Sequence, residues 1–154
     1  NMTAAERNAR TAPTRRIVRT ELITILETST PPPGAQTTQA KYLQLSFMKA
    51  EPGNAAEYVA FSRKYYKPMW QERINQGKMN RWVLAAVRYP AGTGREYNYI
   101  GADYFDKVED LDATIPGLFQ KVHPNANQAE FSAQNLALRK QVLVELLRLL
   151  EHMQ

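Results

Sequence analysis

Three segments of the chain are predicted to be β-strands, and in the first of them apolar residues recur at every second position. The first segment begins at Lys41, where leucine and phenylalanine side chains alternate with more polar neighbours. The other two occupy 80–89 and 96–105, and the glycine-containing segment 90–95 between them suits a hairpin loop. The pattern therefore predicts that the last two strands are antiparallel neighbours.

A long helix is predicted over 54–76, between the first two strands. Asn54 is a candidate N-cap because Glu57 follows three residues later, and Gly77 is well placed to end the helix. Pro68 lies inside this segment and has no N–H to donate, so we expect a kink or a break in the helix around it.

Helical leucine spacing also predicts two flanking helices, at 15–27 and 132–152. Six residues are identical when 15–27 is laid over 139–151, and this favours an internal repeat over chance convergence of two leucine-rich helices. Three successive prolines near the start of the chain indicate a linker. The predicted organisation is an N-terminal helix over 1–28 that ends a preceding repeat, a Pro-rich linker over 29–40, and a ferredoxin-like domain over 41–154 with a long C-terminal helix.

Strand, helix, hairpin and helix make up most of a split β-α-β unit. The predicted class is therefore α+β, with a ferredoxin-like antiparallel sheet and helices on one face. Segment 108–115 is predicted to be a short helix and 118–128 irregular, so that 118–122 is the only candidate for a fourth strand. A face carrying Tyr97, Tyr99 and Phe105 should not remain in water, so we expect a second copy, the N-terminal helix, or both to cover the sheet.

The composition allows one hydrophobic core, because 44% of the 154 residues are hydrophobic. The chain has no cysteine, which excludes thiol catalysis, thiolate metal sites and disulfides. No segment contains the roughly 18–20 consecutive apolar residues that a membrane-spanning helix needs. The cellular location stays open: Asn1 before Met2 is either a cloning remnant or an internal start, and an exported protein that has lost its signal sequence is one of the alternatives.

The formal net charge of +5 raises the question of nucleic-acid binding. Most of the excess comes from arginines between Arg7 and Arg19, and elsewhere basic and acidic residues are interleaved. No nucleic-acid-binding motif accompanies this charge, so nucleic acid is not an expected partner.

A set of short motifs occupies 48–53 (MKAEPG), 67–70 (KPMW), 72–74 (ERI), 77–78 (GK), Trp82, 89–90 (YP) and 96–99 (EYNY). Together they resemble a group of bacterial proteins related to the dimeric α/β barrel superfamily, which includes antibiotic-biosynthesis-type monooxygenases. The resemblance extends over 42–105 and implies a sheet that pairs face to face with a second one, as a homodimer or with a tandem copy. It implies a fold more firmly than a function, since that superfamily includes enzymes, haem degraders and ligand binders.

Cofactor-independent monooxygenases of that superfamily use Asn and Trp near a cleft, with Tyr or Arg nearby, to hold a phenolic substrate. In this chain strand alternation places Asn80 and Trp82 on one face and Arg81 on the other. Aromatic core packing is the alternative role for the tryptophans. The candidate ligand-binding residues are Tyr65, Tyr66, Trp70, Asn80, Trp82 and Asp103, and no catalytic residue is assigned.

Asp103 is the most informative carboxylate, since it lies within an otherwise apolar strand and would need a partner when ionised. Arg81 or Arg88 on the neighbouring strand is the expected partner. A structural ion pair across the strands is favoured over a general base.

Several cofactor classes find no support in the sequence. His123 lies beside Pro124 and His152 is almost terminal, so neither is persuasive as a haem ligand, and no residues have metal-ligand spacing. The glycines of the 90–95 loop lie in a hairpin and not between a strand and a helix, which disfavours a nucleotide. No cofactor or metal is therefore expected.

We interpret the chain as a small-molecule-binding domain with an aromatic-lined cavity. The alternative is a cofactor-independent, monooxygenase-like enzyme that acts on a small aromatic or phenolic substrate. A third possibility is an interaction module built on the two leucine-rich helices. Polar groups converging on a closed cavity would favour the enzyme, and an exposed apolar helix face would favour the interaction module.

Overall fold

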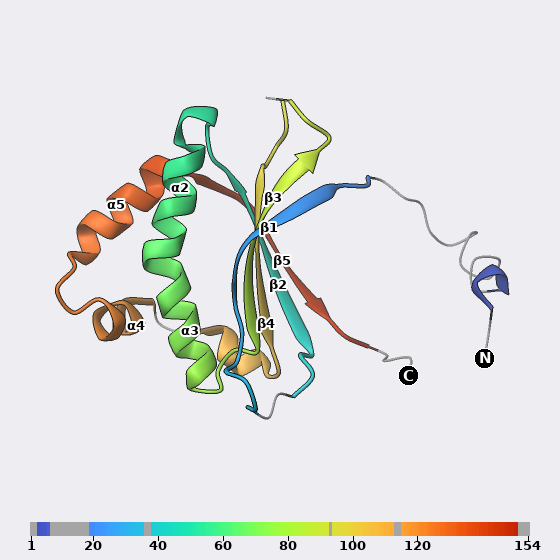
Figure 1. Cartoon of the computed structure of the whole chain (residues 1–154), viewed down its shortest axis with the longest axis horizontal. Helices are drawn as coiled ribbons and strands as arrows, with labels where there is room; N and C mark the ends of the chain where they lie inside the picture. The colour runs from blue at the N-terminus through green and yellow to red at the C-terminus, as the bar shows by residue number, and fades with distance from the viewer. Residues whose placement is uncertain (1–2, 7–18, 36–37, 93, 113–114, 151–154) are drawn as a thin grey trace.

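The computed structural model of the chain describes residues 3–6, 19–35, 38–92, 94–112 and 115–150. Within these residues one five-stranded sheet is packed against a layer of helices, and the helices labelled α2 to α5 all lie on the same side of it (Figure 1). The predicted α+β class, with helices on one face of an antiparallel sheet, is confirmed.

The strands follow the order β1-β3-β4-β2-β5 across the sheet, and every neighbouring pair is antiparallel. From β2 onward the chain runs strand, helix, strand, strand, helices, strand, which is consistent with a ferredoxin-like fold; β1 adds a fifth strand beside β3. The predicted antiparallel pairing of β3 with β4 is confirmed. The strands are β1 (Leu22–Ser29), β2 (Tyr42–Lys49), β3 (Arg81–Tyr89), β4 (Tyr99–Phe105) and β5 (Lys140–Arg148).

The long helix predicted after the first strand is confirmed, and it is continuous in three parts. A 3-10 turn, η1 (Pro52–Asn54), leads into α2 (Ala55–Phe61), the π-helical turn η2 (Ser62–Tyr66) and α3 (Lys67–Asn75). The irregularity expected around Pro68 is this π turn, in which the N–H of Lys67 bonds to the carbonyl of Ser62. Gly77 then ends the helix with a positive φ of 68°.

Asn54 does precede the helix, but its side chain makes no capping hydrogen bond, contrary to prediction. Its amide instead donates to the carbonyl of Ala137 at 3.2 Å and so ties the start of the long helix to the end of α5. The helical elements that follow β4 are η3 (Val108–Asp112), α4 (Ile115–Val122) and α5 (Gln128–Leu138). The prediction of irregular backbone over 118–128 was therefore wrong, because α4 occupies its first half.

The two flanking helices are the largest errors of the sequence analysis. Leu22–Ser29 forms β1, and the segment predicted as one helix over 132–152 divides into α5 and the strand Lys140–Arg148. Leucine-rich spacing fits either structure, and here backbone pairing with β3 and β2 outweighs helix propensity. The fourth strand of the unit is thus β5 and not 118–122, and residues 15–18 and 151–152 lie outside the described part of the chain.

These strands also change the interpretation of the Pro-rich segment 29–40. It connects β1 to β2, which belong to the same sheet, so Leu22–Ser29 is part of this sheet and not a helix of a preceding unit. An interaction module built on two leucine-rich helices is excluded for the described residues, because both leucine-rich segments are strands there.

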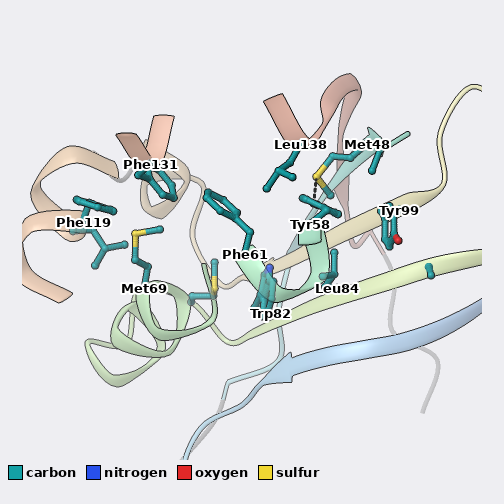
Figure 2. Close-up of a cluster of buried hydrophobic side chains, with 14 of the residues drawn as sticks. Met48, Tyr58, Phe61, Met69, Trp82, Leu84, Tyr99, Phe119, Phe131 and Leu138 are labelled. Atoms are coloured by element: carbon teal, nitrogen blue, oxygen red, sulfur yellow. Dashed lines mark hydrogen bonds between the residues drawn. The ribbon is translucent and has the colours of Figure 1, made fainter. Parts of the chain in front are cut away.

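The main core lies between the sheet and the helices. Trp82 and Leu84 of β3 contact Phe61 and Met69 of the long helix within one buried cluster, and Phe119 and Phe131 extend it toward α4 and α5. Figure 2 shows these side chains meeting between the two layers, with the Tyr58 hydroxyl bonded to the sulfur of Met48. Tyr99 and Phe105 belong to this core, so the helices cover them.

The opposite sheet face carries two smaller apolar clusters, one around Phe47 and Val87 and one around Val83 and Ala102. Tyr97 packs on this face, with its ring centroid 4.6 Å from that of Phe47. The N-terminal helix expected as a cover does not extend over Leu22–Ser29, since that segment is β1.

A β-bulge in β1 connects this edge strand to the helices. The register shifts between Ile25 and Glu27, which brings Glu27 opposite Leu84 and onto the helix-covered face. There its carboxylate accepts hydrogen bonds from Arg63 Nε at 2.6 Å and Lys67 Nζ at 2.8 Å. The Lys67 and Arg63 interactions lower the pKa of Glu27.

We expect Glu27→Gln to lower the free energy of unfolding by about 1–3 kcal/mol at neutral pH, because a charge-assisted contact between the β1 edge and the helix layer is lost. The depressed pKa means that this contribution is present above the ordinary glutamate value of 4.5 and is lost as the pH falls through the folded-state value. Urea denaturation at several pH values measures the difference. Exposed Glu109→Gln is the matched control. If the difference in unfolding free energy between Glu27→Gln and wild type does not shrink in acid, the stabilising role of the Glu27 carboxylate is contradicted.

Candidate functional site

A cavity of about 180 Å³ lies between the helix-covered face of the sheet and the long helix. Its helical wall is a single stripe of residues spaced three or four apart, which places their side chains on one face. The stripe consists of Tyr58, Ser62, Tyr66, Trp70 and Arg73.

The floor of the cavity is formed by alternate residues of three strands, as the two-residue period of a strand requires. β2 contributes Gln44 and Ser46, β4 contributes Gly101 and Asp103, and β3 contributes Trp82. Gly101 lies in a central strand opposite Ser46 and Leu84, where any side chain would point into this space. Glycine weakens a strand interior and often marks a close approach of another group, so we interpret this one as keeping the floor open.

The rim of the cavity comes from the junction of α5 with β5. Arg139 and Gln141 lie there, and Arg139 Nη1 donates to Gln141 Oε1 at 3.2 Å. The same guanidinium also reaches the Tyr66 hydroxyl at 3.4 Å and Asn135 at 3.2 Å. The helix-to-strand change at Arg139 is therefore what brings this second arginine to the site.

Asp103 is almost completely buried, with 8% of its surface exposed. The Gln44 amide donates to its Oδ2 at a long 3.4 Å, and the guanidinium of Arg73 attracts it from α3. Burial, opposed by that attraction, raises the pKa of Asp103 from 3.8 to about 7. The carboxyl group can therefore gain or lose a proton near neutral pH.

Arg73 is the buried cation of the site, with 5% of its surface exposed. Its guanidinium carbon lies 5.5 Å from the centroid of Trp70 and 5.2 Å from that of Phe105, and its Nη2 donates to the backbone carbonyl of Asp110. Burial lowers the pKa of Arg73, while Asp103 and Asp110 oppose the shift. Because an arginine stays protonated at physiological pH, the cavity has a fixed positive charge in its wall.

Two buried polar atoms of the wall have no hydrogen-bond partner among the described residues. They are the hydroxyl oxygen of Ser62 and Nε of Arg73. An unsatisfied buried donor costs roughly 1–3 kcal/mol, so such atoms are unusual in a finished core. Tyr58, beside Ser62, is held neutral, because burial raises the pKa of its hydroxyl; an interaction with the Ser62 side chain opposes this shift.

Four of the six candidate residues from the sequence line this cavity: Tyr66, Trp70, Trp82 and Asp103. Tyr65 instead packs among Phe119, His123 and Phe131 on the α4–α5 side of the helix. Asn80 lies outside the cavity, where its amide donates to the carbonyl of Thr38 at 3.0 Å.

The predicted partner of Asp103 was wrong. Arg81 lies on the opposite sheet face over the ring of Tyr104, and Arg88 donates to Thr24 at the edge of the sheet. Arg73 reaches Asp103 from the helix layer instead. The prediction considered only residues on the neighbouring strand, whereas the side chain of Asp103 faces the helices.

Sequence reasoning did not single out Ser62 and Arg73 as site residues, although a signal was present. Both carry polar groups at helical spacing from Tyr66 and Trp70, on a stripe that faces apolar strand positions. Polar residues on the buried stripe of an amphipathic helix are uncommon and indicate either a network or a site.

No group of three or more histidine, cysteine, aspartate or glutamate side chains that could hold a metal ion is found among the described residues. His123 contacts the carbonyl of Tyr65 through Nε2 at 3.2 Å. In the same part of the chain, no helix is long and apolar enough to cross a membrane.

Comparison with known proteins adds no family assignment. No protein-family model matches the chain, and a search of curated protein sequences found no significant match. The function therefore has to be argued from the cavity itself.

We expect Asp103→Asn to change how stability depends on pH. A raised carboxyl pKa means that the folded state keeps a proton which the unfolded chain releases, so the wild-type protein loses stability relative to the variant as the pH rises from 3.8 to about 7. The slope should approach about 1.4 kcal/mol per pH unit at most. Urea denaturation across this range measures it, with Asp106→Asn as control; parallel profiles for wild type and Asp103→Asn would contradict the assignment.

Proposed function

We propose that this protein binds a small molecule in the cavity between the sheet and the long helix. The observation that carries the proposal is the pair of unpartnered polar atoms, Ser62 Oγ and Arg73 Nε, on residues that line the cavity. Buried polar groups are normally satisfied, and a bound ligand would supply a partner to at least one of them.

The volume of the cavity limits the size of the ligand. An engineered apolar cavity of roughly 150 Å³ accommodates benzene. A space of about 180 Å³ is therefore suited to one six-membered ring with a small substituent. The flat side chains of Tyr66, Trp70 and Trp82 in its wall favour an aromatic ring.

An enzyme of the monooxygenase-like kind, acting on a small phenol without a cofactor, is the second candidate. Asp103 favours it, because a carboxyl group whose pKa is about 7 suits general acid–base chemistry at neutral pH. The position of Asn80 outside the cavity weighs against the particular arrangement expected from the resemblance.

We also propose that two copies of the sheet pair face to face, as in a dimeric α/β barrel. Helices α2 to α5 all cover the other face, and this face carries apolar residues on all five strands. On the edge strands Ile23, Ile25, Leu143 and Leu147 have 46%, 56%, 47% and 47% of their surface exposed. Glu145 lies on the same face, opposite Leu45. An extended and largely apolar face of this kind is typical of an interface.

Gly101→Val tests the binding proposal, because its side chain would occupy the floor of the cavity. A Cβ at this position would meet Met48 Cε at 3.4 Å, an ordinary contact, and valine favours strands, so the fold should be retained. We expect toluene and phenol to bind the wild-type protein in ligand-observed NMR, and Gly101→Val to weaken both by at least about tenfold.

Gly94→Val, at an exposed position between β3 and β4, is the matched control and should bind both probes like the wild type. Equal binding by Gly101→Val and wild type would rule out this cavity as the site. Conversion of phenol to an oxidised product in the same samples would favour the enzyme over the binder.

Face-to-face pairing predicts a dimer in solution that depends on the edge strands. We expect light scattering after gel filtration to give twice the chain mass for the wild type and the single-chain mass for Leu143→Glu combined with Leu147→Glu, because buried charges without partners are costly. Leu136→Glu on α5, where the leucine is 76% exposed, should leave the dimer intact. A wild-type monomer would contradict the pairing.

A further inference from the structure

We propose that the ligand is a small aromatic carboxylate, whose carboxylate binds Arg73 while Asp103 takes up one proton from solvent. The inference rests on the proposed small-molecule-binding function and specifies the chemical class of its ligand. Three features of the same cavity wall carry it: a buried cation, a buried carboxyl group and the aromatic side chains beside them.

The cation lacks a direct counter-ion. None of the ion pairs among the described residues includes Arg73, and Asp103 and Asp110 act on it only through longer-range attraction. Its Nη2 is bonded to a backbone carbonyl, while its Nε has no partner. Buried charges in proteins are normally paired, so an anionic group in the cavity would provide the counter-ion of this arginine.

The geometry of the donors fits a carboxylate better than a larger anion. The guanidinium of Arg73 lies between the rings of Trp70 and Phe105, which restrict how it can turn. The planar fork of N–H donors on a guanidinium suits a planar, singly charged acceptor. A phosphate carries more charge and would leave oxygens without donors in a space of about 180 Å³.

The ring of such a ligand would lie against the aromatic part of the wall. Tyr66 and Trp70 come from the helix and Trp82 from β3, so they flank the cavity from both layers. Tyr66 and Trp70 are stacked on one another, with ring centroids 5.9 Å apart. In a ligand whose ring is joined directly to its carboxylate, the carboxylate would contact Arg73 while the ring contacts the aromatic side chains.

A second negative charge beside Asp103 requires a proton. Arg73 on α3 is the cation that favours the ionised form of Asp103, and a ligand carboxylate would take over part of that attraction. Two adjacent carboxylates share one proton more readily than they both ionise. The proton would therefore remain on Asp103 when the anion is bound.

The other groups around the cavity are not carboxyl groups that would take up this proton. Tyr58 on α2 and Tyr66 in the π turn are phenols, Arg139 at the rim is a cation, and Asp110 lies beyond Arg73. Neither β2 nor β3 contributes a titratable side chain to the wall; Gln44 and Trp82 face the cavity there. Asp103 is thus the carboxyl group in direct reach of the anion.

Isothermal titration with benzoate and with neutral benzamide tests the inference. Free Asp103 has a pKa of about 7, so the dissociation constant of benzoate should be nearly constant below that pH and rise about tenfold per pH unit above it. At about pH 8, titrations in buffers of different ionisation enthalpy should show uptake of about one proton per benzoate. Benzamide should bind with no such dependence, and Asp103→Asn should remove the dependence for benzoate.

Variants of the anion site separate this inference from the binding proposal. Arg73→Gln should weaken benzoate by at least about twentyfold and benzamide by less than about threefold, since only the charged ligand uses the cation. Arg81→Gln makes the same change on the opposite sheet face and should leave both ligands unaffected. Arg73→Lys, which keeps the positive charge and is the second variant if Arg73→Gln does not fold, should weaken benzoate about three- to tenfold, because an ammonium group lacks the planar fork of donors.

The outcomes are distinguishable. Binding of benzamide or toluene without benzoate would overturn the carboxylate inference and leave the binding proposal standing. Failure of every ring probe to bind would overturn both. Benzoate binding that is independent of pH and of Arg73 would also overturn the inference, because the anion would then lie elsewhere.

Discussion

The packing of the long helix on one face of the sheet is the interaction on which the rest of the molecule depends. Phe61 and Met69 from the helix meet Trp82 and Leu84 from β3, and this contact positions every side chain that faces the space between the layers. The π turn at Ser62–Tyr66 lies at the middle of that contact, directly before Pro68. The π turn contains one more residue than an α-helical turn. The stripe from Tyr58 to Arg73 therefore keeps facing the sheet, although Pro68 would otherwise disturb the regular helix.

A layer packed this way would ordinarily be filled with apolar side chains. Here it contains Asp103 and Arg73, which burial disfavours in their charged forms, and a glycine at position 101 that leaves space beside them. Each of these choices weakens the core when taken alone. Their concentration in one cavity is the pattern expected of a site that is completed by another molecule, and sites are where proteins depart from the rules of stable packing.

The two edges of the sheet are stabilised differently. β1 is joined to the helix layer through Glu27, Arg63 and Lys67, while β5 pairs only with β2 and is exposed along its whole length. An exposed apolar edge strand is a liability for an isolated chain. The face-to-face pairing proposed for this protein would cover that strand together with the apolar face next to it.

The sequence by itself determined the local structure of 41–105. Period-two alternation predicted β2, and the hairpin loop at 90–95 between two strand-like segments predicted β3 and β4. Asn54 and Gly77 predicted where the helix between β2 and β3 begins and ends, because such signals depend on a few neighbouring residues. The same local reasoning also placed Tyr66, Trp70, Trp82 and Asp103 among the candidates.

Only the tertiary structure decided the edges of the sheet and the composition of the site. Leu22–Ser29 and Lys140–Arg148 have leucine spacings that fit a helix, and they are strands because β3 and β2 offer them backbone partners far away in the sequence. The meeting of Arg73 with Asp103, and the exclusion of Tyr65 and Asn80, likewise depend on how the helix layer lies over the sheet. Long-range pairing and packing bring together residues that no local pattern relates, which is the physical reason that the sequence predicted the elements better than the site.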